Sequence, residues 1–322
     1  MQQDALESSH TSDREKPSAL LTMVSENVAS AMHPDRNEDS LIVDQQGGLA
    51  AVLDGVGGST AGEIASKIAA RTIQQGWKRV LHRLQQEHAV QAVPGAYERI
   101  DLHSRLLTLV EEAHDQIRAE GRQRLLDQTG QRTGTEDQAT TIALAIFYRQ
   151  PKEREYLMVY AWVGDSRIYL LRGEDPLIRL TRDDGWLTKL VGDQVLTEAD
   201  AFRIDQATDP SQLSEAERST FEKRHGISQA LGDPQSPTIH IDQRMIVSGD
   251  RIILCTDGIH DNLTDKEIET VMRQATFATV AHLLVEQAIE RSRQENTIMM
   301  RAKPDDMSAI VIICSHEGEE FV

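Results

Sequence analysis

Three apolar runs of this sequence end on an aspartate that a small residue follows. They are AAVLDG with Asp54, AWVGDS with Asp165 and ILCTDG with Asp257. A fourth case is inverted, because Asp305 and Asp306 come directly before the apolar run MSAIVIIC. In an antiparallel sheet, the start of one strand lies at the same rim as the end of its neighbour. We therefore expect these carboxylates to gather at one edge of a sheet.

Glu38 and Asp39 open the run DSLIVD and supply two more acidic groups that reach the same rim by the same geometry. Each motif also has a simpler interpretation. An isolated Asp-Gly is typical of a turn, and Glu38-Asp39 alone is typical of a solvated strand end. The convergence of several such motifs at one rim favours a functional site over these simpler interpretations. Carboxylates crowded at one rim repel one another and destabilise the fold unless cations compensate their charge.

The ligand types indicate which cations these would be. Oxygen ligands without cysteine or a histidine pair select hard ions, so Mg²⁺ or Mn²⁺ is the expected occupant. Two such ions, about 3.5 to 4 Å apart, hydrolyse phosphate esters by lowering the pKa of a bound water and by neutralising the phosphoryl oxygens. The pattern therefore favours a metal-dependent phosphoesterase.

Strands and helices must position these residues. Short apolar or alternating runs predict strands at 20–30, 39–44, 48–54, 139–148, 155–165, 166–172, 251–257 and 307–314. The three runs between 139 and 172 look like a meander. Apolar residues at helical spacing predict helices from Thr60 to the Pro94-Gly95 break, over 97–127, from Thr264, and over 276–294. Because strands and helices arrive in blocks, an antiparallel α+β fold is favoured over a doubly wound parallel sheet.

Capping-box spacing supports three of the helix starts. It occurs at Thr60 and Glu63, at Ser214 and Glu217, and at Thr264 and Glu267. The second of these lies in the segment 180–232, which has many polar residues and few apolar anchors. We predict that this segment makes an excursion over the surface as a flap near the site.

Composition excludes several classes of protein. The chain has 322 residues and a net charge of −18, so binding to nucleic acid or to an anionic membrane is not expected. Apolar runs fall short of the roughly 20 residues that a membrane helix needs. The two cysteines, Cys255 and Cys314, lie in apolar runs and suggest no disulfide framework. Residues 1–18 are predicted to be a disordered lead-in without the pattern of a secretory signal, which favours a cytoplasmic location.

Seven motifs carry a resemblance to a known family. They are Asn37-Glu38-Asp39-Ser40, Asp54-Gly55-Val56-Gly57-Gly58, Thr140-Thr141, Gly164-Asp165-Ser166-Arg167, Ala230-Leu231-Gly232, Thr256-Asp257-Gly258-Ile259-His260-Asp261 and Asp305-Asp306-Met307-Ser308. In order and spacing they resemble motifs of the metal-dependent protein phosphatases, the type 2C Ser/Thr phosphatases in their bacterial form. The resemblance spans about 19–314, which implies one phosphatase domain over 19–315 followed by an acidic tail at 316–322.

The resemblance implies a four-layer α-β-β-α sandwich, in which helix pairs flank two antiparallel sheets, and a site for two Mg²⁺ or Mn²⁺ ions with a possible third. Asp54 would bridge the two ions, with the Gly55 carbonyl on one of them and Asp257 and Asp305 on the other. Glu38 and Asp39 would hold metal-bound waters, and Asp165 would join Asp257 at the third ion. The nucleophile would be the water or hydroxide between the metals, so no phosphoenzyme is expected.

The sequence departs from the family pattern at three positions. Pro34 stands where the family usually has a phosphate-binding arginine, and Arg36 either replaces it or is a surface residue. Asp306 stands where the family generally has asparagine, which leaves open whether Asp305 alone or both residues coordinate. Val56 stands where many eukaryotic members have a histidine. The proton for the leaving group would then come from water or from another residue, His33 or His260.

The expected activity is hydrolysis of phosphoserine and phosphothreonine on proteins, the products of a Ser/Thr kinase. The alternative is a pseudophosphatase or regulatory module that binds phosphoproteins without turnover; the intact Asp54, Asp257 and Asp305 count against it, and Pro34 counts for it. A hydrolase of nucleotides or small phosphoesters is disfavoured, because the sequence lacks a P-loop signature.

Overall fold

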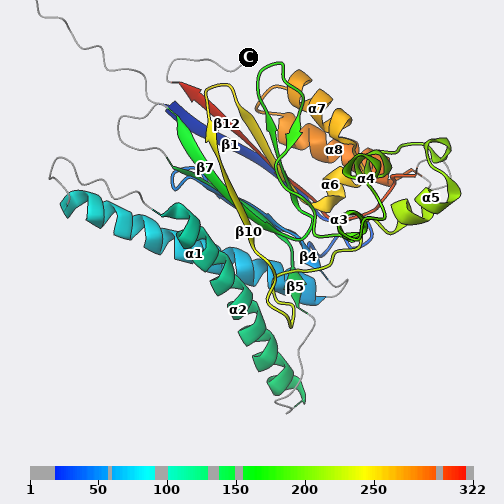
Figure 1. Ribbon diagram of the computed structural model, residues 1–322. Coiled ribbons are helices and arrows are strands. Elements are labelled where there is room, and N and C mark those ends of the chain that lie inside the picture. The colour runs from blue at the N-terminus through cyan, green and yellow to red at the C-terminus, as the bar shows by residue number, and fades with distance from the viewer. Residues whose placement is uncertain are drawn as a thin grey trace, which may run out of the picture.

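The computed structural model describes residues 19–56, 60–90, 101–129, 138–148, 155–294 and 300–316. The predicted lead-in at 1–18, the Gly57-Gly58 pair, the Pro94-Gly95 break and tail residues 317–322 lie outside these ranges. Within them, two antiparallel sheets stand between groups of helices (Figure 1). This arrangement confirms the predicted α+β class.

Each of the two large sheets has five strands within the described ranges. The first sheet has the order β1-β12-β11-β8-β9, with bounds Ala19–Val28, Met307–His316, Arg251–Cys255, Arg167–Leu171 and Ile178–Arg179. The second has the order β10-β7-β6-β3-β2, with bounds His240–Ile246, Tyr156–Val163, Ile142–Tyr148, Leu49–Leu53 and Ser40–Asp44. A two-stranded ribbon pairs β4 (Gly55–Val56) with β5 (Ala139–Thr140).

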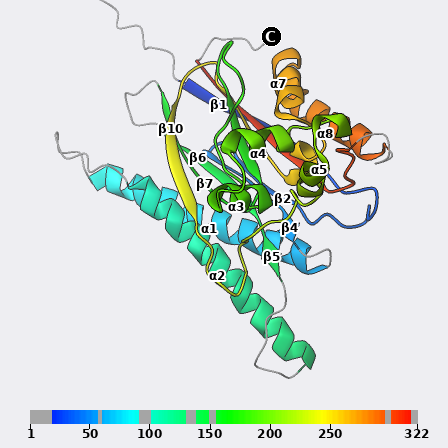
Figure 2. The same ribbon diagram turned by 45° about the vertical axis from the view of Figure 1, so that its right-hand side comes forward.

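Helices cover the outer face of each sheet. Helices α1 (Thr60–Val90) and α2 (Leu102–Thr129) lie along the second sheet, with the end of α2 extending beyond it (Figure 2). Ion pairs from Arg71 to Glu120 and from Arg79 to Glu112 show that these two helices run antiparallel. Helices α7 (Asp265–Gln274) and α8 (Val280–Ser292) cover the first sheet. None of the helices in the described ranges combines the length and apolar character needed to span a bilayer.

Three clusters of buried apolar side chains separate four layers. One lies between α1 and α2 and the second sheet, one between the two sheets, and one between the first sheet and α7 and α8. Both strand faces are therefore buried, and successive residues alternate between clusters. In β3, Leu49, Ala51 and Leu53 face the helices, whereas Ala50 and Val52 face the other sheet. This explains the continuous apolar run of β3, since a strand buried on both sides has no polar face.

The predicted meander is wrong in its third strand. Strands β6 and β7 pair as expected, but β8 lies in the other sheet, where it pairs with β11 and β9. Gly164, with φ of +94°, turns the chain between β7 and β8, which lie in different sheets. The sequence pattern does not predict the edge strand β10, because its residues 242–245 are all exposed and three of these four are polar, which leaves no apolar run.

Two of the predicted capping boxes are confirmed, at Ser214 with Glu217 and at Thr264 with Glu267. The second long helix begins at Leu102, where the Asp101 carboxylate accepts a hydrogen bond from the amide of Ser104. The start expected near Tyr97 lies outside the described residues.

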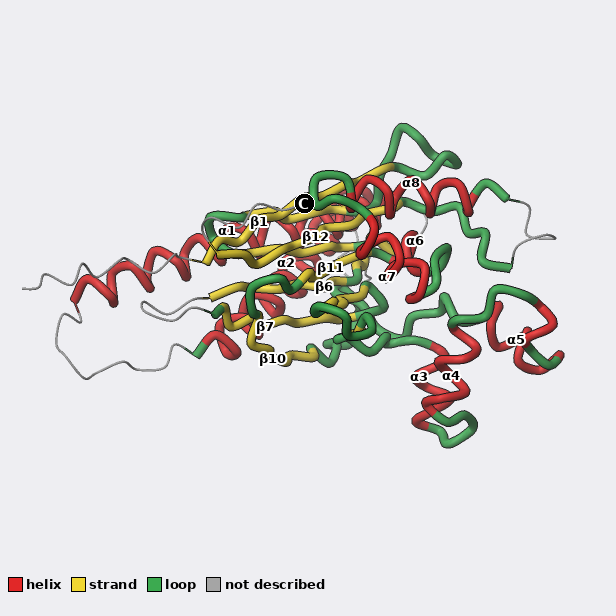
Figure 3. Tube along the Cα trace, turned by 90° about the horizontal axis from the view of Figure 1, so that it is seen from above, coloured by secondary structure: helices red, strands yellow, loops and turns green. Residues whose placement is uncertain are grey.

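Residues 180–232, which we call the flap segment, contain α3 (Trp186–Gly192), α4 (Glu198–Asp205), α5 (Glu215–Glu222) and a short 3-10 helix (Pro210–Gln212). These pieces gather to one side of the sheets (Figure 3). They pack on a small apolar cluster of their own, formed by Ile204, Ala207, Leu213 and Phe221.

Candidate functional site

The aspartates singled out in the sequence all lie where strands begin or end. Asp54 separates β3 from β4, Asp165 lies between β7 and β8, and Asp305 comes two residues before β12. Asp257 is the first residue of α6 (Asp257–His260), just after β11. Asp39 directly precedes β2. We call these five residues the carboxylate cluster.

The structure brings the five side chains close enough to perturb one another. Burial raises the pKa of Asp54 well above its usual range, and the negative charges of Asp257, Asp39, Asp305 and Asp165 raise it further. Burial followed by neighbouring carboxylates likewise raises the pKa of Asp165. The cluster therefore brings together carboxylates whose mutual repulsion disfavours their charged forms.

Asp54 is held through its backbone. Its carbonyl oxygen accepts hydrogen bonds from the amide of Thr141 and the hydroxyl of Thr140, each at 2.8 Å. The next residue, Gly55, donates its amide to the Glu38 carbonyl at 3.2 Å. A Cβ on Gly55 would come within 2.4 Å of the Gly62 backbone, so only glycine lets the first turn of α1 pass this closely.

Asp39 connects the two sheets. Its Oδ2 accepts a hydrogen bond of 2.8 Å from the Thr256 hydroxyl, which in turn accepts one from the amide of Ser308 at 3.1 Å. Burial raises the pKa of the Asp39 carboxyl well above its usual range, although hydroxyl hydrogen bonds oppose this shift. These contacts fix the start of β2 against the ends of β11 and β12.

Asp306 and Asp305 have different surroundings, although they are neighbours in the chain. The two oxygens of the Asp306 carboxylate accept hydrogen bonds from the backbone amides of Ser30 and Glu38, both at 2.7 Å. Asp306 therefore anchors the loop that carries Glu38. Asp305 is partly exposed, and its Oδ2 lies 2.9 Å from the ammonium nitrogen of Lys303.

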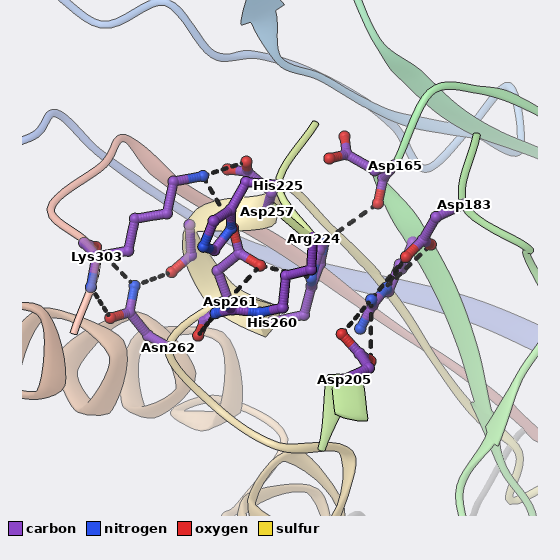
Figure 4. A network of polar contacts seen from close by, with 12 residues as sticks. Asp165, Asp183, Asp205, Arg224, His225, Asp257, His260, Asp261, Asn262 and Lys303 are labelled. Carbon is purple, nitrogen blue, oxygen red and sulfur yellow. Dashed lines mark hydrogen bonds and ion pairs between the residues drawn. The ribbon is translucent and has the colours of Figure 1, made fainter. Parts of the chain in front are cut away.

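Lys303 is a member of the site that sequence reasoning missed. Its Nζ lies 2.5 Å from Oδ2 of Asp257, 2.9 Å from Oδ2 of Asp261 and 2.9 Å from Oδ2 of Asp305. Figure 4 shows Lys303 pointing toward Asp257, with Asp261 and His225 beside them. His225 Nδ1 is hydrogen-bonded to the Asp261 carboxylate and so connects the flap segment to the site. No motif marked Lys303 or His225, because their roles depend on contacts made only in the folded chain.

A second ionic network is built around Arg167, two residues after Asp165. Arg167 is buried and pairs with Asp183 at 2.6 Å and with Asp205 at 3.2 Å. Buried Arg301 donates to the carbonyl oxygens of Asp205 and His260. Burial alone would raise the pKa of Asp205, but Arg167, Arg179 and Arg301 outweigh it and hold the pKa below its usual range.

The basic residues proposed from the sequence lie in different environments. The Arg36 guanidinium lies 3.4 Å from Oε1 of Glu38 at the edge of the cluster. His33 donates from Nδ1 to the Arg36 carbonyl at 2.9 Å, and this hydrogen bond raises its pKa. His260 is buried, with Nε2 3.1 Å from the carbonyl oxygen of Asp165, and burial lowers its pKa to about 4. His260 is therefore neutral at pH 7.

The donor set fits a hard cation. Oδ1 of Asp257 is buried and has no hydrogen-bond partner within the described ranges. A buried carboxylate oxygen without a partner is unfavourable, and a cation would relieve this. Among the residues that the structure describes, however, no three acidic, histidine or cysteine side chains are already arranged around one ion position, and Lys303 lies between Asp257 and Asp305.

A cavity of about 580 Å³ adjoins the site on the side of the flap segment, and His225 lines it. Its wall includes Trp186, and the ammonium groups of Lys189 and Lys223 each lie 5.9 Å from the centre of the Trp186 ring. Since His225 also contacts Asp261, this cavity lies next to the carboxylates on the side of Lys303.

Comparison with known proteins relates this arrangement to one family. The sequence model of the family described as "Protein phosphatase 2C" matches residues 33–296. The serine/threonine protein phosphatase PstP of Mycobacterium tuberculosis is 27% identical over 267 residues, which cover 83% of this chain and 42% of PstP. The serine/threonine phosphatase stp of Listeria innocua is 22% identical over 77% of this chain and 81% of its own length. The chain thus spans less than half the length of the mycobacterial relative.

Solved structures share the fold. The crystal structure of M. tuberculosis PstP/Ppp matches with a TM-score of 0.64 and 24% identity, covering 92% of this chain and 100% of that chain. A structure of the PstP catalytic domain, described as a complex with two manganese ions, matches with a TM-score of 0.61 and 23% identity over 92% of this chain and 100% of its own.

Proposed function

Because the chain belongs to the protein phosphatase 2C family, we propose that it is a metal-dependent phosphatase that removes phosphate from phosphoserine and phosphothreonine on proteins. The observation that carries this proposal is the carboxylate cluster, in which four aspartates raise the pKa of a fifth, Asp54. A fold that keeps so many buried carboxylates together needs cations to stabilise it.

We assign the metal ligands as follows. Asp54, the Gly55 carbonyl, Asp257 and Asp305 hold two Mg²⁺ or Mn²⁺ ions, and Asp165 with Asp257 holds a third. Glu38 and Asp39 act through water. The oxygen-only donors and the unpartnered Oδ1 of Asp257 support this assignment. The two manganese ions named for the PstP catalytic domain also support it.

When bound, these ions lower the pKa of a coordinated water and neutralise the phosphoryl oxygens. The protein supplies position. The hydrogen bonds to its carbonyl fix the backbone of Asp54, and the Thr256 contact fixes the carboxylate of Asp39. Arg36, which lies beside Glu38, binds the phosphate. His260 is unsuited to protonate the leaving group, because it is neutral at pH 7 and its Nε2 lies against the Asp165 carbonyl. His33 and solvent remain the candidate proton donors.

The substrates are phosphoproteins, the products of a Ser/Thr kinase, and we place the peptide beside the flap segment. The cavity beside His225 offers a peptide the Trp186 ring, the ammonium groups of Lys189 and Lys223 and the carboxylate of Glu222. Nucleic acid and anionic membranes are disfavoured as partners by the net charge of −18. We also propose a cytoplasmic location, which fits the burial of Cys255 and Cys314 as small apolar side chains within β11 and β12.

The test is turnover of a phosphothreonine peptide and of p-nitrophenyl phosphate with Mn²⁺, with Mg²⁺ and with excess chelator. Both substrates should be hydrolysed with either metal and not with chelator, and nucleotides should be hydrolysed far more slowly than the peptide. Full activity after metal removal would refute the mechanism. A protein that binds the phosphopeptide in the presence of Mn²⁺ without hydrolysing it would instead be the pseudophosphatase considered above.

A further inference from the structure

Lys303 places a positive charge between two of the proposed metal ligands. Its Nζ contacts Oδ2 of Asp257 at 2.5 Å and Oδ2 of Asp305 at 2.9 Å, and a third contact reaches Oδ2 of Asp261 at 2.9 Å. A lysine side chain is charged at neutral pH, and contact with three carboxylates favours its ammonium form.

The fold holds the backbone of Lys303 in place. Its amide donates to Oδ1 of Asn262 at 3.0 Å, and its carbonyl accepts from Nδ2 of the same asparagine at 2.9 Å. Nδ2 of Asn262 also donates to the carbonyl of Gly258, one residue after Asp257. Asn262 is fully buried, so the lysine backbone is fixed relative to Asp257.

A divalent ion and this ammonium cannot use the same oxygen together. Within the part of the chain that the structure describes, Asp257 leaves Oδ1 free, but Asp305 does not, because its Oδ1 accepts from the amide of Asp306 at 2.9 Å and its Oδ2 contacts Lys303. Mg²⁺ binds carboxylate oxygens at about 2.0 to 2.1 Å, which would place the ion next to the ammonium with nothing to separate the two charges. We propose that Lys303 is an internal counter-cation that occupies the Asp257–Asp305 metal position and that the incoming ion must displace it. This inference rests on the proposed metal assignment and adds that the affinity of one ion is held down by the lysine.

The displaced ammonium has a partner to which it can retreat. Asp261 is not among the proposed ligands, and it already contacts Lys303. Its carboxylate also accepts from His225 of the flap segment and lies 3.9 Å from the Arg224 guanidinium. Lys303 can thus keep Asp261 while it leaves Asp257 and Asp305.

In the alternative role, Lys303 supports metal binding by orienting the two aspartates. The two roles predict opposite changes in metal affinity when the lysine is removed. Removing a competing cation strengthens metal binding, whereas removing a supporting residue weakens it, typically by 10- to 100-fold.

The experiment is calorimetric titration of the metal-free protein with Mn²⁺, for wild type and Lys303→Gln. Displacement predicts that the weaker of the two main ions binds about 10-fold more tightly in Lys303→Gln. Lys303→Arg keeps a positive charge at this position, so its Mn²⁺ affinity should stay near that of the wild type. Lys266→Gln, which removes an exposed lysine paired with Glu269, is the matched control and should change nothing. The tightening should persist at high salt, because contact between charges is screened far less than long-range attraction.

Thermal unfolding gives a second readout. Metal-free Lys303→Gln should melt at a lower temperature than wild type, because Asp257 and Asp305 lose their counter-cation, and Mn²⁺ should raise its melting temperature by more. Asp261→Asn removes the partner for the displaced lysine and should weaken Mn²⁺ binding, the reverse of Lys303→Gln.

Unchanged or weaker Mn²⁺ binding by Lys303→Gln, in a wild type that binds Mn²⁺, overturns the displacement and leaves the proposed function intact. If the wild type itself takes up no Mn²⁺, the metal assignment fails, and the displacement fails with it. A variant too unstable to titrate is replaced by Lys303→Met, which keeps the aliphatic stem and removes the charge.

Discussion

Asp306 accepts a 2.7 Å hydrogen bond from the backbone amide of Glu38, although 268 positions separate the two residues in the chain. Its other oxygen accepts from the amide of Ser30 at the same distance. Asp306, the neighbour of the proposed ligand Asp305, thus anchors the backbone of a loop that is distant in sequence. Through this loop it also fixes Arg36, which lies between the two anchored amides.

Asp306→Ala should destabilise the protein by about 2 to 4 kcal/mol, because it leaves two backbone amides without their charged acceptor. Urea unfolding in metal-free buffer measures this loss. Asp306→Asn keeps one carbonyl oxygen and removes a negative charge near Asp39, so it should lose less stability. Equal stability of wild type and Asp306→Ala would contradict the anchoring role.

Asp54→Asn should lower phosphatase activity by several orders of magnitude without unfolding the protein. The substitution removes the proposed bridging charge and also relieves repulsion within the carboxylate cluster, so the metal-free melting temperature should stay level or rise. Turnover of p-nitrophenyl phosphate with saturating Mn²⁺ and a melt without metal are the two measurements. A rate near that of wild type would refute the assignment.

Arg36→Ala should raise KM for a phosphothreonine peptide by about 10-fold, since a phosphate contact made equally in the ground and transition states changes binding and spares kcat. Arg36→Lys keeps a charge but not the forked geometry of the guanidinium, so its KM should lie between those of the wild type and the alanine variant. Steady-state kinetics at saturating Mn²⁺ separates KM from kcat. An unaltered KM in the alanine variant would return Arg36 to the role of a surface residue paired with Glu38.

Asp165→Ala should raise the Mn²⁺ concentration needed for half-maximal activity while both main ions still bind. Asp165 is buried, and the charge of Asp257 raises its pKa, which is consistent with a cation shared between the two. Activity measured over a range of Mn²⁺ concentrations, with calorimetry to count the ions, tests this. A metal requirement identical to that of wild type would count against a third ion.

Asp205→Asn should destabilise the protein at pH 7 by about 3 kcal/mol, because it leaves Arg167 and Arg179 short of a buried partner. The pKa of Asp205 is lowered in the folded state, so its contribution is present above the unfolded value of about 3.9 and is lost as pH falls toward the folded value. The difference in unfolding free energy between wild type and Asp205→Asn should therefore become smaller below about pH 4. Urea unfolding at pH 7 and pH 3 measures it, and the exposed Asp200→Asn should show a much smaller effect at pH 7.

The central strands could be predicted because burial on both faces makes them continuous apolar runs, and β3 and β12 are the clearest cases. The carboxylates could be found because each lies at the end of such a run. Assignment of these strands to sheets could not be predicted, since the crossing at Gly164 moves β8 to the other sheet without changing its local pattern. Strand β10 could not be predicted, because four consecutive residues in it are exposed and three of them are polar, so no apolar run marks it.

The charged residues that pair around the cluster could not be predicted from the sequence, for a different reason. Lys303 and Asp257 are 46 positions apart, and His225 and Asp261 are 36 apart, so only the folded chain pairs them. Motif order predicted the family, and the match over 33–296 confirms it. The metal roles of the individual aspartates stay predictions until ions are titrated.

Both ends of the flap segment are fixed beside the aspartates. At one end Asp184 exchanges hydrogen bonds with Gly164, accepting from its amide and donating to its carbonyl, and it is also bonded to His240. At the other end Leu231 bridges to Thr140, which also holds the Asp54 carbonyl. The base of the flap is thus tied to the sheets at both ends, and Asp205 and His225 between these ends add contacts to Arg167 and Asp261. Under the proposed function, exposed residues of the intervening helices could be exchanged to change which phosphoprotein is bound, while these attachments and the contacts of Asp205 and His225 are kept.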